Sequence, residues 1–443
     1  MRNIPRYGRF WTRCYTASRA VYFVYNLLFA IGFLFALPFY LWKDRGSGKY
    51  RRTFRERMGA LPIAVTTSDR PSIWIHAVSV GEVLAAKALI AALRERLPRH
   101  RLFLSTTTVT GNAVARKSLS GLDGLFFAPL DFPWPVRKAL RALDPALLVI
   151  METELWPNLI REARRHGTRI AIANGRISPR SYPRYRLSRL FWRRVLPQVD
   201  LFLMQSEPHA ERVRALGAPA ERVRVPGNLK YDAVADARPP ERLALIVGDS
   251  AERPLLVAGS TVLGEEPQVL RAFQSVRACT PKAALVIAPR HPERFASVPA
   301  LVEAAGFRCR RRSETEPGAW QNGEVLLLDT LGELAQVYPL ATAVFVGGSL
   351  MPAGGHNVLE AAAAGKPVVV GPHMENFQEI ADELLGEGAL VQVRSAAELG
   401  EAVSALFADE PRRAELAARA RAIVLRNRGA CARTVEQLAA LLA

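Results

Sequence analysis

The amino-acid sequence predicts two doubly wound α/β domains that face a cleft, preceded by a helix that anchors the chain to a membrane. Three observations support this fold class. An uncharged segment lies near the N-terminus, short apolar runs alternate with helical patterns along the rest of the chain, and a Pro-rich charged stretch interrupts that alternation. Strands that alternate with helices of ordinary length are typical of βαβ units on a parallel sheet.

The composition is that of a globular enzyme with an uneven charge. The 443 residues include 60 Lys and Arg against 41 Asp and Glu, and residues 1–200 alone contain 34 basic and 12 acidic residues. Disordered, collagen-like and disulfide-rich classes are excluded. The first half should contact an anion, for which nucleic acid, a phospholipid surface and a phosphorylated substrate are the candidates. The four cysteines are widely spaced and indicate neither a disulfide framework nor a zinc site.

The uncharged segment extends from Ala20 to Trp42. At about 1.5 Å per residue it covers about 35 Å, against roughly 30 Å for the hydrocarbon core of a bilayer. Aromatic residues near both ends suit the membrane interface, whereas Pro38 favours a kink or an interfacial position. The charged Lys43 follows directly, unlike the cleavage site of a signal peptide. We therefore predict a retained anchor within residues 1–50, either spanning or interfacial.

Residues 51–235 form the first predicted domain, in which apolar strands and helical patterns alternate. The expected strands are Ile73–His76, Leu102–Thr106, Leu125–Ala128, Leu147–Met151, Ile170–Ala173, Leu201–Gln205 and Val223–Val225, with helices over Gly81–Leu97, Thr110–Leu119, Pro135–Leu143 and Pro157–His166. Polar and glycine-rich residues follow these strands, where open α/β sheets bind their ligands.

Residues 236–253 are predicted to be a linker, because they combine a Pro pair with mixed charge. The second domain is expected at residues 254–410. Its expected strands are Leu255–Ala258, Leu285–Ala288, Val325–Leu328, Val344–Val346, Val368–Val370 and Leu390–Val393. Residues 411–443 have a helical pattern throughout and are expected to cross back to the first domain.

Glu82 lies where the first strand of the first domain leads into a helix. The helix dipole stabilises an ionised carboxylate in the first turn, so Glu82 is expected to be deprotonated near neutral pH and exposed. Such a carboxylate suits a general base. A helix-capping role is the alternative interpretation.

Glu152 and Glu154 follow an apolar strand that ends at Met151. On a continuing strand they would share one face, so that one orients the other or a nearby cation. Lys230, in Gly227-Asn-Leu-Lys-Tyr-Asp232, is placed to reach a phosphate or a carboxylate. Capping and ordinary surface roles are the respective alternatives.

An arginine-rich stretch with aromatic residues and no acidic residue runs from Arg176 to Arg194. Arginine mixed with aromatics binds RNA or a bilayer surface. Because the same chain contains an apolar anchor, we favour the membrane over nucleic acid and over a solvated basic helix.

The second domain contains glycine-rich segments after strands or before helices: Gly259-Ser-Thr261, Gly332-Glu-Leu334, Gly347-Gly-Ser349 and Gly354-Gly-His-Asn-Val-Leu-Glu360. Backbone N–H groups in such segments bind phosphate, and Glu360 is placed to bind a ribose hydroxyl. The chain has neither the P-loop nor the GxGxxG pattern, and no Asp-x-Asp pair signals a divalent metal.

Ten short segments occur in an order that resembles the motif set of the Kdo (3-deoxy-D-manno-octulosonic acid) transferases of lipopolysaccharide synthesis. They are WIHAVSVGE, METELWPN, NGRIS, GNLKYD, AGSTVLGEE, APRHPERF, LGEL, FVGGS, GGHNVLE and GPHMENF. The resemblance implies a GT-B fold of two Rossmann-like domains. It also implies transfer of Kdo with inversion from CMP-Kdo to a lipid A precursor, without a metal ion or other cofactor, on the cytoplasmic side of the bacterial inner membrane.

The resemblance also implies roles for individual residues. The general base of the family falls on Glu82, and its transition-state stabilisers fall on Glu152 and Lys230. The CMP site falls on Pro289, Arg290, Leu331, Gly332, Glu333, Asn357, Val358, Leu359 and Glu360. Gly175 and Val358 occupy positions where the family has Ala and Pro.

Two alternatives remain from the sequence. One is a different membrane-associated GT-B transferase that uses a UDP- or ADP-sugar. The other is a membrane-tethered, non-enzymatic protein that binds an anionic ligand through its basic half.

Overall fold

The computed structural model describes residues 21–38, 49–62, 70–234, 238–248 and 253–443, without the side chains of residues 49–52. The chain forms two compact units, which are described separately. Unit 1 consists of the residues up to Ala233 together with Arg428–Ala443, and unit 2 consists of Val234–Asn427. The part of the predicted anchor outside residues 21–38 and 49–50 lies outside the described residues.

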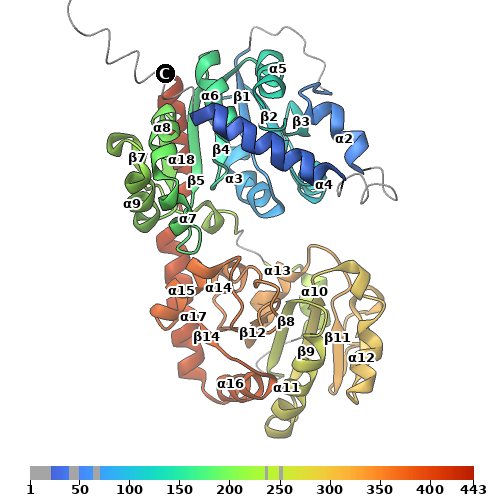
Figure 1. Ribbon diagram of the computed structural model, residues 1–443. Coiled ribbons are helices and arrows are strands. Elements are labelled where there is room, and N and C mark those ends of the chain that lie inside the picture. The colour runs from blue at the N-terminus through green and yellow to red at the C-terminus, as the bar shows by residue number, and fades with distance from the viewer. Residues whose placement is uncertain (1–20, 39–48, 63–69, 235–237, 249–252) are drawn as a thin grey trace, which may run out of the picture. The chain divides into compact units, whose positions relative to one another are not determined.

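Unit 1 is a parallel sheet with helices on both faces (Figure 1). Its strands are β1 (Ser72–His76), β2 (Arg101–Thr106), β3 (Gly124–Phe127), β4 (Pro145–Met151), β5 (Arg169–Gly175), β6 (Leu201–Met204) and β7 (Val223–Arg224). Its helices are the N-terminal helix Val21–Pro38, α2 (Lys49–Arg57), α3 (Val80–Arg96), α4 (Val109–Ser118), α5 (Pro133–Leu143), α6 (Pro157–His166), α7 (Tyr182–Leu187), α8 (Arg189–Val195), α9 (Glu207–Leu216) and α18 (Ala430–Leu442).

The strand order of unit 1 is β3-β2-β1-β4-β5-β6-β7. Alternate side chains of a strand face opposite sides, so Leu147 and Val149 pack with α3, α4 and α18, whereas Leu148 and Ile150 pack with α5, α6 and α9. The strand order reverses between β1 and β4. At such a switch point the loops diverge and leave a crevice at the carboxyl ends of the strands.

Unit 2 is a second parallel sheet. Its strands are β8 (Leu255–Thr261), β9 (Ala284–Pro289), β10 (Arg308–Arg311), β11 (Glu324–Leu327), β12 (Ala343–Val346), β13 (Val368–Val370) and β14 (Val391–Gln392). Its helices are α10 (Glu241–Val247), α11 (Glu266–Cys279), α12 (Val298–Ala304), α13 (Leu334–Val337), α14 (Leu359–Ala363), α15 (Gln378–Gly386), α16 (Ala396–Ala408) and α17 (Glu410–Asn427).

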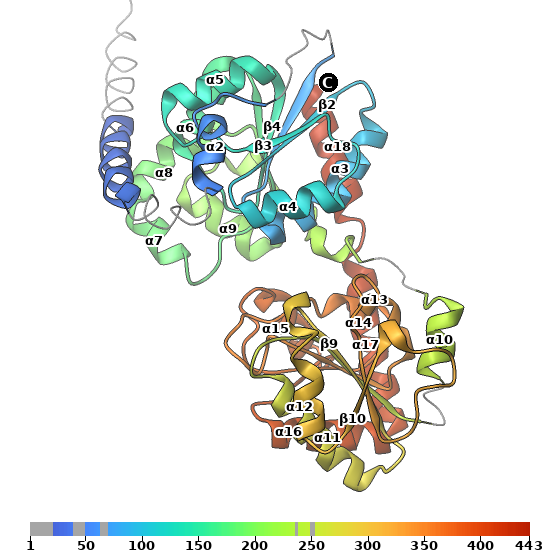
Figure 2. The ribbon, with the colours of Figure 1, turned by 90° about the vertical axis from the view of Figure 1, so that its right-hand side faces the viewer.

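The strand order of unit 2 is β10-β11-β9-β8-β12-β13-β14, and its switch point lies between β8 and β12. Helices α11, α12 and α16 cover one face of the sheet, where buried side chains such as Leu256, Ile287 and Phe345 form the core (Figure 2). Both sheets therefore have the doubly wound architecture that the sequence predicts.

Three features differ from the sequence prediction: the linker, one missed strand and the C-terminal helical stretch. The expected linker, 236–253, contains α10, whose Leu243, Ile246 and Val247 are buried. The strand β10 has the sequence RCRR and no apolar run, so hydrophobic patterning did not reveal it. The helical stretch 411–443 is divided near Gly429, which has a φ of +87°; α17 stays with unit 2 and α18 packs on α3 of unit 1.

Candidate active site

Glu82 lies in the first turn of α3, beside the switch point of unit 1. Ser79 is the N-cap residue: its Oγ accepts a hydrogen bond from the Glu82 N–H and donates one of 2.8 Å to Glu82 Oε1. The Val78 N–H donates a 2.8 Å hydrogen bond to Glu82 Oε2. Ser79 thus caps the helix, and the Glu82 carboxylate binds the backbone one residue before the cap, so the alternative capping role applies to Glu82 as well. It fixes the position of the carboxylate.

Burial sets the protonation of Glu82, contrary to the sequence prediction. The residue is only 6% exposed. Loss of solvation raises its pKa to about 7, although the hydrogen bonds from Val78 and Ser79 oppose the shift. The nearby charges of Glu152 and Glu154 add to the rise. The prediction of an exposed carboxylate was wrong, and desolvation outweighs the stabilising donors, so that Glu82 is ionised only in part near neutral pH.

Glu152 directly follows β4 and has a left-handed backbone conformation, with a φ of +51°. Its Oε1 lies 3.8 Å from Lys230 Nζ, and both side chains are largely shielded from solvent. β4 ends at Met151, so Glu152 and Glu154 do not share the face of a continuing strand. Instead, Glu154 accepts a 2.8 Å hydrogen bond from the indole N–H of Trp156. The two glutamates therefore have separate partners.

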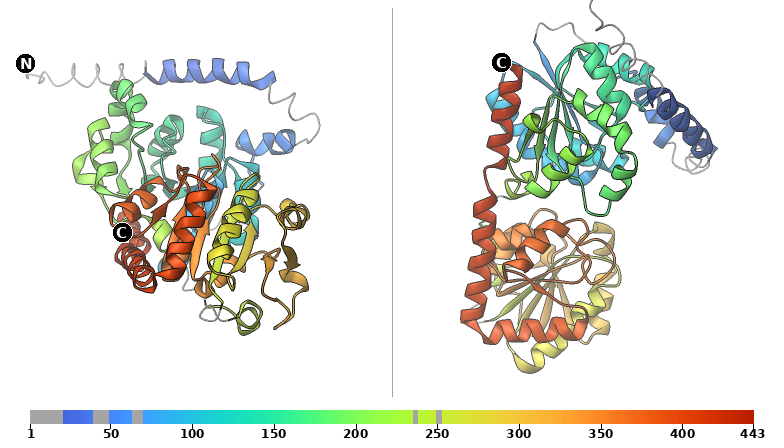
Figure 3. Two further views of the ribbon diagram at one scale, coloured as in Figure 1. Left: turned by 90° about the horizontal axis from the view of Figure 1, so that it is seen from below. Right: turned by 60° about the vertical axis from the view of Figure 1, so that its left-hand side comes forward.

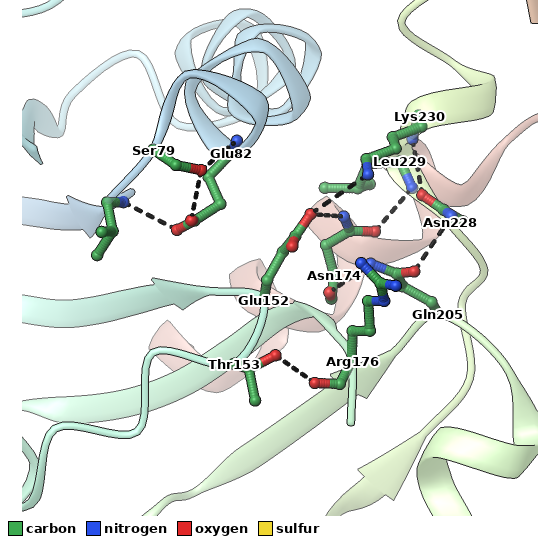
Figure 4. A network of polar contacts seen from close by, with 11 residues as sticks. Ser79, Glu82, Glu152, Thr153, Asn174, Arg176, Gln205, Asn228, Leu229 and Lys230 are labelled. Atoms are coloured by element: carbon green, nitrogen blue, oxygen red, sulfur yellow. Dashed lines mark hydrogen bonds and ion pairs between the residues drawn. The ribbon is translucent and has the colours of Figure 1, made fainter. Parts of the chain in front are cut away.

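Asn174 joins the Glu152 and Lys230 segments into one network (Figure 4). It is near the end of β5 and also has a left-handed conformation, with a φ of +55°. Its Oδ1 accepts a 3.0 Å hydrogen bond from the Leu229 N–H, and its Nδ2 lies 3.5 Å from Glu152 Oε1. Non-glycine residues in this conformation are costly and cluster at functional sites. Asn174 belongs to the motif NGRIS, but the sequence alone assigns no role to its side chain.

Two further amides complete the support of Lys230. Asn228 Oδ1 accepts the backbone N–H of Lys230, and Asn228 Nδ2 donates to Gln205 Oε1. Gln205 Nε2 in turn donates a 2.9 Å hydrogen bond to the Asn174 carbonyl. The structure thus brings together all three predicted catalytic residues. A proton-accepting carboxyl lies beside a positioned ion pair, an arrangement suited to acid–base and electrostatic catalysis.

Gly175 follows Asn174 and is in tight contact with β6. A Cβ atom at this position would lie 2.5 Å from Met204 Sδ. The methionine therefore fills the space that a side chain at position 175 would need.

In unit 2, a buried carboxylate holds the loop after β12. Glu265 is fully buried and accepts hydrogen bonds from the N–H groups of Gly348, Ser349 and Leu350, at 2.7, 3.1 and 3.0 Å. The glycine-rich loop was expected to bind a phosphate with such donors. In the predicted segment Gly347–Ser349, the N–H groups of Gly348 and Ser349 are already bound by the Glu265 side chain.

The predicted nucleotide-binding residues Arg290, Asn357 and Glu360 lie close together. Asn357 Nδ2 donates a 3.0 Å hydrogen bond to Glu360 Oε1. Burial raises the pKa of Glu360, and the donor Asn357 and the charge of Arg290 oppose the rise. Burial, with help from Arg290 and His291, lowers the pKa of His356 to about 4, so His356 is neutral at physiological pH.

The remaining predicted nucleotide-binding residues divide into two groups. The side chains of Pro289, Val358 and Leu359 are buried, so only their backbones are available to a ligand. Leu331 is 63% exposed and Gly332 has a φ of +89°. Glu333 is bound by Arg312 and by the Thr330 hydroxyl.

Among the described residues, no cluster of three or more His, Cys, Asp or Glu side chains is arranged to hold a metal ion. The described residues do include one helix, Val21–Pro38, that is long and apolar enough to cross a membrane.

The comparisons with known proteins cover most of the chain. Residues 52–233 match the family described as 3-deoxy-D-manno-octulosonic-acid transferase (kdotransferase), and residues 315–423 match the glycosyl transferases group 1 family. The calicheamicin glycosyltransferase CalG4 is 18% identical, covers 85% of this chain and 99% of its own, and has a TM-score of 0.52. That likeness concerns the fold alone and agrees with the predicted GT-B architecture.

Two curated relatives carry the name 3-deoxy-D-manno-octulosonic acid transferase. The protein of Haemophilus influenzae is 34% identical over 88% of this chain and 92% of its own length. The protein of Bordetella pertussis is also 34% identical, over 90% of this chain and 94% of its own length. This extent of identity confirms the predicted resemblance and an enzymatic rather than a purely binding role. The chain belongs to the 3-deoxy-D-manno-octulosonic acid transferase family of glycosyltransferases.

Proposed function

We propose that this protein transfers Kdo from CMP-Kdo to a lipid A precursor at the cytoplasmic face of the inner membrane, with inversion and without a metal ion. The observation that carries the proposal is the site in unit 1, where Glu82, with its pKa raised to about 7, lies in the electrostatic field of Glu152. A base with this pKa accepts a proton readily at neutral pH.

In the proposed reaction, an acceptor hydroxyl attacks the anomeric carbon of Kdo. The new C–O bond forms as the bond to the CMP phosphate oxygen breaks, and CMP leaves with the electron pair. The hydroxyl proton passes to Glu82. By analogy with glycoside hydrolysis the transition state is oxocarbenium-like, so the nearby Glu152 carboxylate stabilises its positive charge. The ammonium group of Lys230, 3.8 Å from Glu152, balances the negative charge of the Kdo carboxylate or the departing phosphate.

Unit 2 supplies the donor site in this proposal. The Glu360 carboxylate binds a ribose hydroxyl and is oriented by Asn357 Nδ2 at 3.0 Å. Arg290 is exposed, follows β9 and provides a positive charge for the CMP phosphate. The exposed arginines of the first half favour an anionic, phosphorylated acceptor over a neutral one.

The test is a product analysis. The full chain is incubated with CMP-Kdo and a lipid A precursor, and the product is analysed by mass spectrometry and by NMR of the anomeric configuration. We expect a mass gain of one or more Kdo residues, inverted configuration and unchanged turnover in the presence of a chelator.

Parallel reactions with UDP- and ADP-sugars test the rival donors, and calorimetry compares the binding of CMP with that of UDP. Transfer from a UDP-sugar with no transfer from CMP-Kdo would overturn the donor assignment. Loss of activity on chelation, restored by a divalent ion, would overturn metal independence.

A further inference from the structure

The N-terminal helix Val21–Pro38 lies along the outside of unit 1 and is attached to it by polar contacts (Figure 3). The Tyr25 hydroxyl donates a 2.7 Å hydrogen bond to Asp131 Oδ2. Asn158 Nδ2 donates a hydrogen bond of the same length to Asn26 Oδ1. Asp131 also accepts the backbone N–H groups of Asn158 and Leu159, at the start of α6. The helix is therefore joined to a buried polar centre of unit 1.

Aromatic contacts extend this attachment along the same helix face. Tyr22 is 1% exposed, belongs to the core cluster of unit 1 and accepts a 2.8 Å hydrogen bond from Gln198 Nε2. Further along, the rings of Phe29 and Phe33 meet the ring of Phe132 at centroid distances of 4.9 and 5.8 Å. The contacts from Tyr22 to Phe33 cover about 17 Å of helix, at 1.5 Å per residue.

The opposite face of the helix is apolar and uncovered. Its exposed side chains, between 42% and 82% accessible, are Phe23, Val24, Leu27, Leu28, Ile31, Leu34 and Phe35. A row of large apolar side chains on the surface of a folded unit marks an interaction site.

This geometry does not fit a helix that crosses a bilayer. A spanning helix would carry its attached partners, including Asp131, Asn158 and Gln198, into the hydrocarbon, where polar groups and irregular backbone are strongly unfavourable. A helix in the membrane plane keeps these partners on the aqueous side and buries only its outer face.

A basic surface lies next to the helix. The ring of Phe191 in α8 lies 5.9 Å from that of Tyr25, so α8 and the adjacent α7 are neighbours of the helix (Figures 2 and 3). Leu187 and Leu190 are 92% and 72% exposed. The exposed arginines around them are Arg180, Arg184, Arg186, Arg189, Arg193 and Arg194, with no acidic residue in this stretch. Apolar side chains surrounded by arginines complement an anionic lipid surface.

We propose that Val21–Pro38 does not span the bilayer but lies in the plane of an anionic phospholipid surface as a fixed part of unit 1, with Leu187 and Leu190 inserting into the same surface. The sequence left a spanning and an interfacial anchor open, and the contacts of Tyr22, Tyr25 and Asn26 favour the interfacial one. This inference rests on the membrane location in the proposed function, and it is tested without donor or acceptor so that the two can fail separately.

The first experiment measures depth. Nitroxide spin labels are attached to cysteines at Phe23, Leu28 and Phe35 in the full chain, with the native cysteines replaced, and bound to phosphatidylethanolamine–phosphatidylglycerol vesicles. An in-plane helix places all three labels at one shallow depth, about 5–10 Å below the headgroups. A spanning helix separates the labels at 23 and 35 by about 18 Å along the membrane normal. Unequal depths of that size would overturn the proposal.

The second experiment measures vesicle binding with all native cysteines present. The paired change Leu187→Ser with Leu190→Ser should weaken binding by about tenfold or more, because two leucines lose their burial in lipid. The matched control is Leu245→Ser with Leu263→Ser in unit 2, whose side chains are 58% and 71% exposed. Equal binding by the two pairs would remove α7 and α8 from the membrane surface.

The apolar face of the helix could instead bind a second copy of the chain. Sedimentation in detergent, combined with dipolar broadening of the spin label at position 28, distinguishes a dimer contact from a membrane contact. A detergent-resistant dimer with close Leu28 labels that persists on vesicles would overturn the proposal, whereas monomers in detergent with shallow labels on vesicles support it.

Discussion

The two switch points of this protein share one topology but hold different groups. In unit 1 the carboxyl ends of β1 and β4 present charged side chains, with Glu82 near β1 and Glu152, paired with Lys230, after β4. In unit 2 the corresponding edge at β8 and β12 presents backbone, held by the buried carboxylate of Glu265. Unit 1 therefore gathers ionisable side chains at its switch point, whereas in unit 2 a buried side chain occupies the loop donors and the charged Arg290 and Glu360 lie on neighbouring segments.

The difference shows how one fold serves two tasks. A parallel sheet reliably places loops at its switch point, but the residues in those loops decide what the site can do. If this division is right, substitutions in unit 1 should lower turnover with little effect on nucleotide binding, and substitutions in unit 2 should do the reverse.

Glu82→Gln should have the largest effect. Glutamine keeps the volume and most hydrogen bonds but cannot accept the acceptor proton, so kcat should fall by about two to four orders of magnitude. CMP affinity, measured by calorimetry, should be unchanged. Glu95→Gln, an exposed position on the same helix, is the control. Near-normal turnover would show that Glu82 is only a helix cap. A melting curve must accompany the assay, because a substitution at this buried site can also lower stability.

Lys230→Met should lower kcat by about 10²-fold, since the substitution removes one positioned charge from the transition state. It also leaves Glu152 without its partner at 3.8 Å. Lys87→Met on the exposed face of α3 is the matched control. A rise in the Kd for CMP with an unchanged kcat would place Lys230 in nucleotide binding and break the division between the units.

Glu360→Ala should act on binding instead. Loss of a hydrogen bond to a charged group costs roughly 1.5–3 kcal/mol, which corresponds to about a 10- to 150-fold rise in the Kd for CMP. At saturating donor, kcat should change little. Glu401→Ala, at an exposed position of α16, serves as the control. An unchanged Kd in a calorimetric titration would remove Glu360 from the donor site.

The pH profile gives the smallest effect and the sharpest test of burial. The pKa of Glu82 is raised to about 7, so the base is protonated and inactive below that pH. The rate at low acceptor concentration should rise with pH and level off above about 7. The free energy of unfolding should change in the opposite direction. The contribution of Glu82 to stability is lost as pH rises from the unfolded pKa near 4.3 towards 7, because burial in the native state disfavours the ionised form. An activity limb near pH 4.5 would contradict the burial.

The sequence predicted most strands of the two sheets, but it did not predict the burial and hydrogen-bond partners of the side chains at their edges. Apolar runs such as Leu147–Met151 and Val344–Val346 predicted strands because buried parallel strands must be apolar. The edge strand β10 was not predicted because Arg308, Arg310 and Arg311 leave it without an apolar pattern. The raised pKa of Glu82 was not predicted because it depends on the packing of the whole β1–α3 turn. The support from Asn174 and Gln205 depends on register between strands, which patterning does not encode.

The return of α18 to unit 1 has a consequence for biosynthesis. Asp232 caps the start of this helix by accepting the N–H groups of Gly429 and Cys431, and α18 packs on α3 and β5. During translation, Asp232 emerges nearly 200 residues before these partners, and all of unit 2 is made in between. Unit 2 can therefore complete its fold first, while the apolar face of unit 1 near Leu89 and Ala173 stays uncovered. We expect the nascent unit 1 to depend on chaperones or on the membrane surface until residues 428–443 are synthesised.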